Sequence, residues 1–184
     1  MIYNVRFTIY DLAGRKITSC LVLLAVGFWL LASGCKVNYS FTGASVSPDI
    51  KTFSVKYFPN NAPIVNPSLS QAFTEKLKEK IVSQASLSHT DRQADLILEG
   101  SITSYATQPI AIQSNETAAL NRLTIAISVK FTNTKNEKQN FETSFSRYAD
   151  YDSQQNLSSV EQQLSATITD QIVDDIFNKV FINW

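Results

Sequence analysis

The strictest pattern in this chain is a ten-residue alternation of apolar and polar side chains at residues 123–132, LTIAISVKFT. Leucine, isoleucine, valine or phenylalanine occupies every odd position, and threonine, alanine, serine or lysine every even one. Successive side chains of a strand point to opposite faces, so the pattern predicts a strand with one buried face. Such a strand needs apolar cover on one side only, which favours an antiparallel sheet with its other face polar.

Three other segments alternate in the same way: residues 50–58, 95–105 and 141–145. The polar residues 133–139 predict a hairpin loop that returns the chain antiparallel into the last of these strands. Gly100 lies inside the second strand, where a missing side chain indicates a bulge or a close approach of another group. The first strand is expected to place Phe53, Val55 and Tyr57 on its apolar face.

Two segments carry apolar stripes at helical spacing. The stripes consist of Leu69, Phe73, Leu77 and Ile81 in the first segment, and of Val160, Leu164, Ile168, Ile172, Ile176 and Val180 in the second. Asn66 with Pro67 predicts the start of the first helix, and Ser158 with Glu161 predicts a capping box at the start of the second.

The order strand, helix, three strands, helix predicts one α+β domain. We expect a two-layer sandwich in which a mostly antiparallel, four-stranded sheet packs against the two helices. Residues 85–94, which include His89, are expected to form a polar loop. Residues 106–121 are expected to form a long connection, and a connection of that length in a compact domain hints at function or mobility.

The N-terminal region has the pattern of a secretory address. Arg15 and Lys16 precede the uncharged residues 17–32, and Ser33 and Gly34 then lead to Cys35. A positive segment, an apolar run and a small-residue cleavage site make up a signal peptide. The 16 apolar-run residues fall short of the ~20 that a spanning helix needs.

The sequence LASGC at residues 31–35 resembles the lipobox of bacterial lipoproteins, after which the cysteine carries the lipid (palmitate in the usual case) and becomes the mature N-terminus. An ordinary signal peptide or an uncleaved anchor is the alternative. We therefore expect a lipoprotein signal peptide at 1–34, a lipidated Cys35 with its tether at 35–49, and a single domain at 50–184.

Composition excludes several classes of function. The whole chain has 16 Lys and Arg against 16 Asp and Glu, and no basic run, so a nucleic-acid surface is not expected. One histidine and two cysteines cannot build a usual zinc or haem site, and no glycine-rich phosphate loop exists. The acid pairs Asp150/Asp152 and Asp174/Asp175 lack the spacing of a catalytic or calcium site. We expect no enzyme, no metal and no cofactor.

Four basic residues are candidate ligand contacts. Arg122, Lys130, Lys135 and Lys138 lie in or beside the two ends of one strand and its hairpin. Such residues can donate charge-assisted hydrogen bonds to phosphates near a membrane, although solvated loop charges would give the same pattern. Trp184, the last residue, is a candidate aromatic anchor for a partner; alternatively it closes the core.

The order of motifs resembles the lipopolysaccharide-assembly lipoprotein family LptE, in the form found among Bacteroidetes. The motifs are the lipobox at Cys35, YSFTG (39–43), KTFSV (51–55), FPNN (58–61), LSQAFTE (69–75), ADLILEG (94–100) and NETAALNRLT (115–124). The resemblance implies a plug inside the outer-membrane β-barrel LptD that helps lipopolysaccharide reach the cell surface. It also implies lipopolysaccharide binding through basic residues at one end of the sheet, here matched to Arg122, Lys135 and Lys138.

Residues 36–39 lack the acidic run expected of surface-exported lipoproteins in that phylum, which favours an outer-membrane protein facing the periplasm. Two other readings stay open. ADLILEG (94–100) also fits lipoproteins that activate a peptidoglycan synthase, curli-secretion-like subunits, or another envelope-assembly adaptor. A hydrolase of the envelope is disfavoured because no nucleophile and base arrangement is present.

Overall fold

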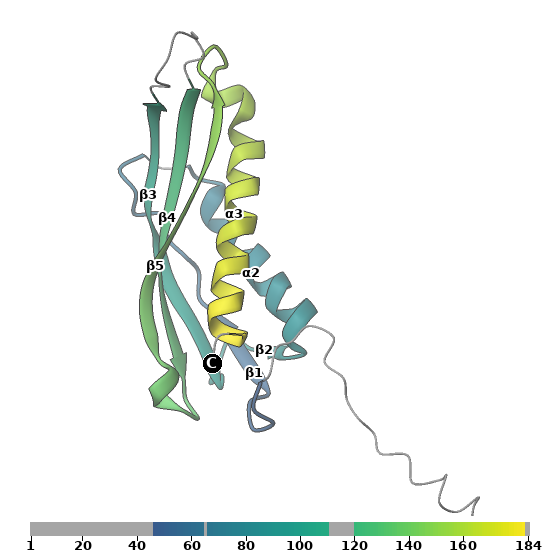
Figure 1. The fold of residues 1–184 in the computed structure, drawn as a ribbon. Helices are drawn as coiled ribbons and strands as arrows, with labels where there is room; N and C mark the ends of the chain where they lie inside the picture. The colour runs from purple at the N-terminus through teal and green to yellow at the C-terminus, as the bar shows by residue number, and fades with distance from the viewer. Residues whose placement is uncertain (1–45, 65, 111–119, 183–184) are drawn as a thin grey trace, which may run out of the picture. The chain divides into compact units, whose positions relative to one another are not determined.

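The computed structural model of the chain describes residues 46–64, 66–110 and 120–182 (Figure 1). The expected signal peptide, Cys35, most of the tether, the central part of the 106–121 connection and Trp184 lie outside the described residues. The chain divides into two units, 1–39 and 40–184, and all the described residues belong to the second.

The sheet has five strands in the order β2-β1-β3-β4-β5. Their bounds are β1 Thr52–Val55, β2 Ser88–His89, β3 Leu96–Ile110, β4 Leu120–Asn133 and β5 Phe141–Asp152. The α+β class is confirmed, but the expectation of four mostly antiparallel strands is wrong. β1 runs parallel to both β2 and β3, and only the β3–β4 and β4–β5 pairs are antiparallel. The helix α2 follows β1 and provides the crossover connection that parallel strands need.

The fifth strand, β2, comes from the segment expected to be a polar loop. Two residues are too few to show an alternation, so the pattern of side chains could not reveal it. His89 pairs with Phe53 in the register and also places its ring against the Phe53 ring, with 5.3 Å between their centroids. The histidine is thus a packing residue at the edge of the sheet.

The central strands are longer than the sequence predicts. β3 continues to Ile110, and its last residues pair with Leu120 to Thr124 of β4, so part of the expected 106–121 connection is strand. Pro109 lies in this upper part of β3, where no described strand pairs with it on the β1 side beyond the single bridge at Ile102. A proline without an N–H is tolerated in such an edge segment.

The first strand is shorter than predicted because the chain leaves the sheet after Val55. Tyr57 was expected on the apolar face, but it is 61% exposed, and its neighbour Phe58 is fully buried instead. The chain then returns to the sheet at Asn60, which forms a single parallel bridge with Ile102.

Two helices cover one face of the sheet (Figure 1). They are α2, Leu69–Ala85, and α3, Leu157–Phe181. The predicted stripe of α2 is buried throughout, and that of α3 is buried from Ile168 onward, whereas Val160 and Leu164 are only partly buried. Ion pairs from Lys76 to Asp170 and from Lys80 to Asp174 join the helices along their exposed side.

Both predicted helix starts are displaced. The cap residue of α2 is Ser68 and that of α3 is Asn156, and neither makes a side-chain cap hydrogen bond. Asn66 instead accepts hydrogen bonds from Ser68 and donates to Glu161. Glu161, expected to close a capping box, also accepts a hydrogen bond from the buried Tyr105 hydroxyl at 2.6 Å. Asn66 thus combines local bonds at the start of α2 with a tertiary bond, and the carboxylate of Glu161 bonds to tertiary partners.

Gly100 lies where another group approaches the sheet closely, one of the two roles expected for it. A Cβ at this position would lie 2.0 Å from the Ser128 carbonyl oxygen and 2.7 Å from the Phe58 ring. The Phe58 ring packs in turn on Phe73 of α2, with 5.0 Å between centroids. The register shift of β3 lies between Ile102 and Ser104 rather than at Gly100.

Candidate binding surfaces on the sheet and at its hairpin end

The face of the sheet opposite the helices presents mostly small side chains, most of them polar, with Tyr148 of β5 as a large exposed exception. Along β4, Thr124, Ala126 and Ser128 alternate with the fully buried Leu123, Ile125 and Ile127. Their partners in the register extend the same surface across β3 and β5: Ala106, Ser104 and Ser101 on one side and Tyr148, Ser146 and Ser144 on the other. We call these nine residues the outer face. No described helix covers them (Figure 1).

An ion pair across the strands borders the outer face at each end. Lys130 Nζ lies 2.9 Å from the Glu99 carboxylate at one end. At the other, Arg122 donates two hydrogen bonds, of 2.7 and 2.9 Å, to the Asp150 carboxylate, and its guanidinium carbon lies 3.6 Å from the centre of the Tyr148 ring. The hydrogen bond from Arg122 holds the pKa of Asp150 below its ordinary value. Between the ion pairs the surface carries no charged side chain of β4.

Asp95 organises the end of the sheet where the chain first joins it. Its Oδ2 accepts hydrogen bonds from the backbone N–H of Lys51 and Thr52, each 3.0 Å, and from the Thr52 hydroxyl at 2.9 Å. Its Oδ1 lies 3.3 Å from Lys135 Nζ of the hairpin. The backbone N–H of Lys51 is the largest cause, with the Thr52 hydroxyl next, that lowers the pKa of Asp95 to about 2. The carboxylate therefore fastens β1 to β3.

We expect Asp95→Asn to remove a pH-dependent part of the stability. Because the folded pKa is about 2 and the ordinary value 3.8, the charged group stabilises the fold above pH 3.8, and this contribution is lost as the pH falls through 2. The variant should unfold about 1–2 kcal/mol more easily at neutral pH, but no more easily below pH 2. Urea unfolding at several pH values measures the difference, with the exposed Asp49→Asn as control. Parallel pH profiles of wild type and Asp95→Asn would contradict this role.

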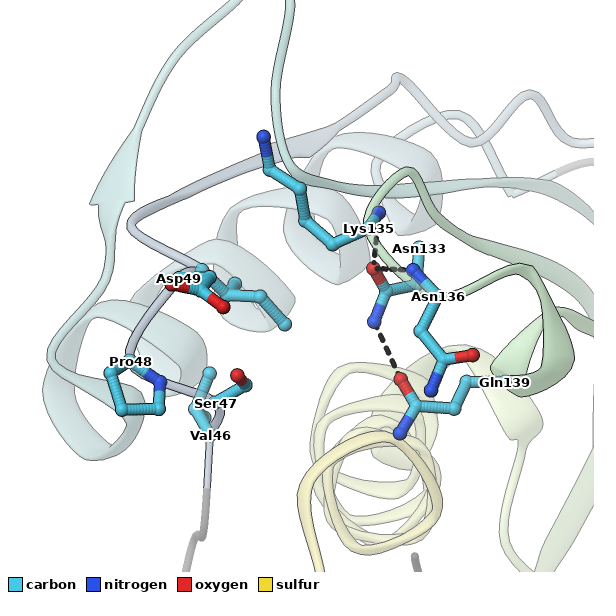
Figure 2. Close-up of a pocket in the computed structure, with 9 residues that line it drawn as sticks. Val46, Ser47, Pro48, Asp49, Asn133, Lys135, Asn136 and Gln139 are labelled. Atoms are coloured by element: carbon cyan, nitrogen blue, oxygen red, sulfur yellow. Dashed lines mark hydrogen bonds between the residues drawn. The ribbon is translucent and has the colours of Figure 1, made fainter.

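A hollow of about 620 Å³ lies next to the ion pair of Asp95 with Lys135, and Figure 2 shows the residues that line it. Residues 46–50 line one side of it, and the hairpin residues Asn133, Lys135, Asn136 and Gln139 line the other. The buried Asn133 fixes the hairpin: its Oδ1 accepts from the backbone N–H of Lys135 and Asn136, at 2.8 and 3.1 Å, and its Nδ2 donates to Gln139 Oε1 at 2.6 Å. The side chains around the hollow are mostly polar and suit a hydrogen-bonding ligand or solvent.

The four candidate basic residues do not form one cluster. Arg122 lies near the start of β4 and Lys135 and Lys138 lie beyond its end, so about 37 Å of strand separates the two groups. Lys130 lies between them along β4, at the border of the outer face. Arg122, Lys130 and Lys135 each have a carboxylate partner, whereas Lys138 has none among the described residues.

The acidic residues that are paired in the sequence do not act as pairs in the structure; Asp150, Asp174 and Asp175 each bind a different basic residue. Asp150 binds Arg122, Asp174 binds Lys80, and Asp175 accepts two hydrogen bonds from Arg147, which fastens β5 to α3. Within the described ranges, no three His, Cys, Asp or Glu side chains are placed to hold a metal ion. In the same part of the chain, neither helix combines the length and apolarity needed to cross a membrane.

Two contributors to these surfaces were missed by sequence reasoning. Asp95 gave no signal beyond a polar residue at the start of a strand, and its role depends on β1 returning beside β3. No sequence pattern links Lys179 to the hairpin, yet its Nζ lies 5.7 Å from the centre of the Phe141 ring. Both contacts join segments that only the tertiary fold brings together.

Comparison with known proteins identifies the family. None of the curated proteins compared with the chain matches it. Among solved structures, a minor lipoprotein from Acinetobacter baumannii has a TM-score of 0.51 at 13% identity, covering 73% of this chain and 95% of that chain. The rare lipoprotein B from Shewanella oneidensis has a TM-score of 0.44 at 9% identity, covering 71% of this chain and 91% of that chain. At 13% identity, the likeness to the Acinetobacter protein concerns the fold alone.

A family model, LptE, described as lipopolysaccharide-assembly, matches residues 50–180. The match covers both helices almost completely and every strand of the sheet. It confirms the resemblance seen in the order of sequence motifs. Since it spans more than half of the chain, the protein belongs to the LptE lipopolysaccharide-assembly family.

Proposed function

We propose that this protein is an outer-membrane lipoprotein that seats the outer face of its sheet in the lumen of an LptD-like β-barrel. In that position it supports the passage of lipopolysaccharide to the cell surface. The observation that carries the proposal is the outer face itself, a surface of mostly small, largely polar side chains that no described helix covers. The family match makes lipopolysaccharide assembly the process in which such a surface acts.

The chemistry of the outer face suits the inside of a barrel. Transmembrane barrels are apolar toward lipid and polar toward their lumen. Apart from Tyr148, the face consists of serine, threonine and alanine, which let a partner approach closely and exchange hydrogen bonds without burying an unpaired charge. The charges at its two ends are already paired, as Lys130 with Glu99 and Arg122 with Asp150, so docking there does not strand a lone ion.

Contacts with lipopolysaccharide and with the barrel wall complete the proposal. Arg122, Lys130, Lys135 and Lys138 remain the candidate lipopolysaccharide contacts, and their separation favours two contact points, one near Arg122 and one at the hairpin. Trp184 remains a candidate contact with the interior of the barrel. The role is one of binding and support, without catalysis.

Membrane attachment depends on Cys35 in this proposal. We expect Cys35→Ala to abolish acylation and to move the protein out of the membrane fraction, because several acyl chains, at about 0.8 kcal/mol per buried methylene, hold it there. Intact-mass measurement of the purified chain detects the lipid. Cys20→Ala is the matched control, since Cys20 lies in the expected signal peptide and should leave acylation unchanged. A wild-type chain without lipid on Cys35 would overturn the anchor.

Affinity capture of the tagged full chain from detergent-solubilised membranes tests the partner. We expect an LptD-like barrel to be recovered with the wild-type chain. Recovery of a penicillin-binding protein without such a barrel would overturn the proposal in favour of a role in peptidoglycan synthesis. Recovery of neither protein would also count against the barrel.

A further inference from the structure

A second hollow, of about 350 Å³, lies between the β4–β5 hairpin and the last turn of α3. Its floor is apolar: the rings of Phe131 and Phe141 have centroids 5.3 Å apart, and Val180 packs beside them in the lining. Lys138 of the hairpin and Lys179 of α3 also line it, and Gln139 lines both this hollow and that of Figure 2.

The polar side chains that line this second hollow can all donate hydrogen bonds: two are lysines, and two are amides whose oxygens already accept a hydrogen bond. Neither Lys138 nor Lys179 has a carboxylate within ion-pair distance among the described residues. The amide oxygens of Gln139 and Asn140 are both engaged by Asn133, through hydrogen bonds of 2.6 and 2.7 Å. Their NH₂ groups make no hydrogen bond with the described residues and remain available as donors. No aspartate or glutamate lines the hollow, so its charge complements an anion.

The helix end alone does not account for this arrangement. A lysine in the last turn of a helix is favoured by the carbonyl groups there, which explains Lys179 taken singly. Lys138, Gln139 and Asn140 belong to the hairpin and not to α3, yet they converge on the same hollow. Two ammonium groups and two amides above an aromatic floor match a ligand that joins a phosphate to an apolar group.

We propose that this hollow binds the phosphate of an anionic phospholipid, so that the hairpin end of the domain rests on the surface of the bilayer. The apolar floor takes the glycerol and the first carbons of the lipid. Ile182, 46% exposed, follows Lys179 and Val180 at the same end of α3 and adds apolar surface there.

The path of the chain favours a membrane as the source of the phosphate. Residues 46–52 lie at this same end of the domain, where Thr52 bonds to Asp95 and Asp95 pairs with Lys135 of the hairpin. Val46 follows Cys35 by 11 residues, a tether of at most about 40 Å. The inference that the hairpin end lies within reach of the bilayer rests on the proposed lipid anchor at Cys35.

Lysine labelling of the full chain in vesicles tests the inference. The chain is purified from membranes and reconstituted in phosphatidylcholine alone or in mixtures with phosphatidylglycerol, then treated with a membrane-impermeant amine reagent and analysed by mass spectrometry. We expect Lys138 and Lys179 each to react about five-fold more slowly in the anionic vesicles, the factor for one lysine at an anionic surface. High salt should restore the rate. Lys56 and Lys78, which do not line the hollow, should react equally in both.

A pair of matched variants tests the site itself. Hydrogen exchange at residues 137–141 should slow in anionic vesicles for the wild type and for Lys56→Gln/Lys78→Gln, but not for Lys138→Gln/Lys179→Gln. Equal labelling in both vesicle types, or equal protection of every lysine, would overturn the inference. Protection by lipopolysaccharide but not by phosphatidylglycerol would overturn the choice of ligand. The mass of the purified chain reports separately on acylation of Cys35, so a failed anchor is told apart from a failed headgroup site.

Discussion

Gly100→Ala is expected to destabilise the fold by about 3 kcal/mol, the largest single effect that we expect on stability. The added methyl carbon would lie 2.0 Å from the Ser128 carbonyl oxygen and 2.7 Å from the Phe58 ring. The carbonyl belongs to the backbone of β4, in the middle of its pairing with β3, so it cannot move without disturbing the ladder. The ring is confined in turn by Phe73.

Urea unfolding of the full chain in mild detergent, followed by circular dichroism, measures this loss. Ser101→Ala is the matched control, because its side chain lies on the outer face and the change should stay within about 0.5 kcal/mol. If Gly100→Ala unfolds at the same urea concentration as Ser101→Ala, then the close approach at Gly100 does not constrain the sheet.

Ser128→Trp is expected to lower recovery of the barrel partner about 30-fold. Ser128 lies on β4 within the outer face, between Ser101 of β3 and Ser144 of β5. An indole there would hold a docked surface away from its neighbours, and loss of a central contact of this kind corresponds to about 2 kcal/mol. The free protein should remain folded, because the side chain points away from the core.

Ser83→Trp provides the control for this substitution. Ser83 is exposed on α2, in the layer opposite the outer face, so the same change in size and polarity should leave capture unaffected. Thermal unfolding of both variants establishes that each is folded. Unchanged recovery with Ser128→Trp, or a loss confined to Ser83→Trp, would show that the partner binds elsewhere.

The sequence predicted those elements whose own residues report their surroundings. The alternation at 123–132 and the stripe headed by Leu69 depend only on which side of an element faces the core, and both are found where predicted. β2 has two residues and no pattern, and the helix starts predicted at Asn66 with Pro67 and at Ser158 with Glu161 lie two residues from the observed caps, Ser68 and Asn156; the Asn66 amide and the Glu161 carboxylate share a tertiary hydrogen bond. Short elements and caps are decided by neighbours that a single segment does not contain.

The candidate surfaces divide in the same way. The outer face follows directly from the polar positions of the alternation, and the basic residues could be read off the sequence. Their ion pairs could not, because Arg122 and Asp150, or Lys135 and Asp95, meet only through the register of the strands. The approach of Lys179 to the hairpin likewise depends on the angle at which α3 crosses the sheet.

The parallel placement of β1 bears on the order in which the domain gains its structure. β3, β4 and β5 follow one another in the sequence and pair as neighbours, so they can form the antiparallel sheet through contacts that are close in the sequence. β1 reaches β3 only after α2 has crossed between them, which requires a much longer loop to close. We therefore expect the antiparallel meander to form the folding nucleus and β1 to dock late. The N-terminal strand of the described domain is then the last part of the sheet to pair, and the hydrogen bonds from Lys51 and Thr52 to Asp95 form with it.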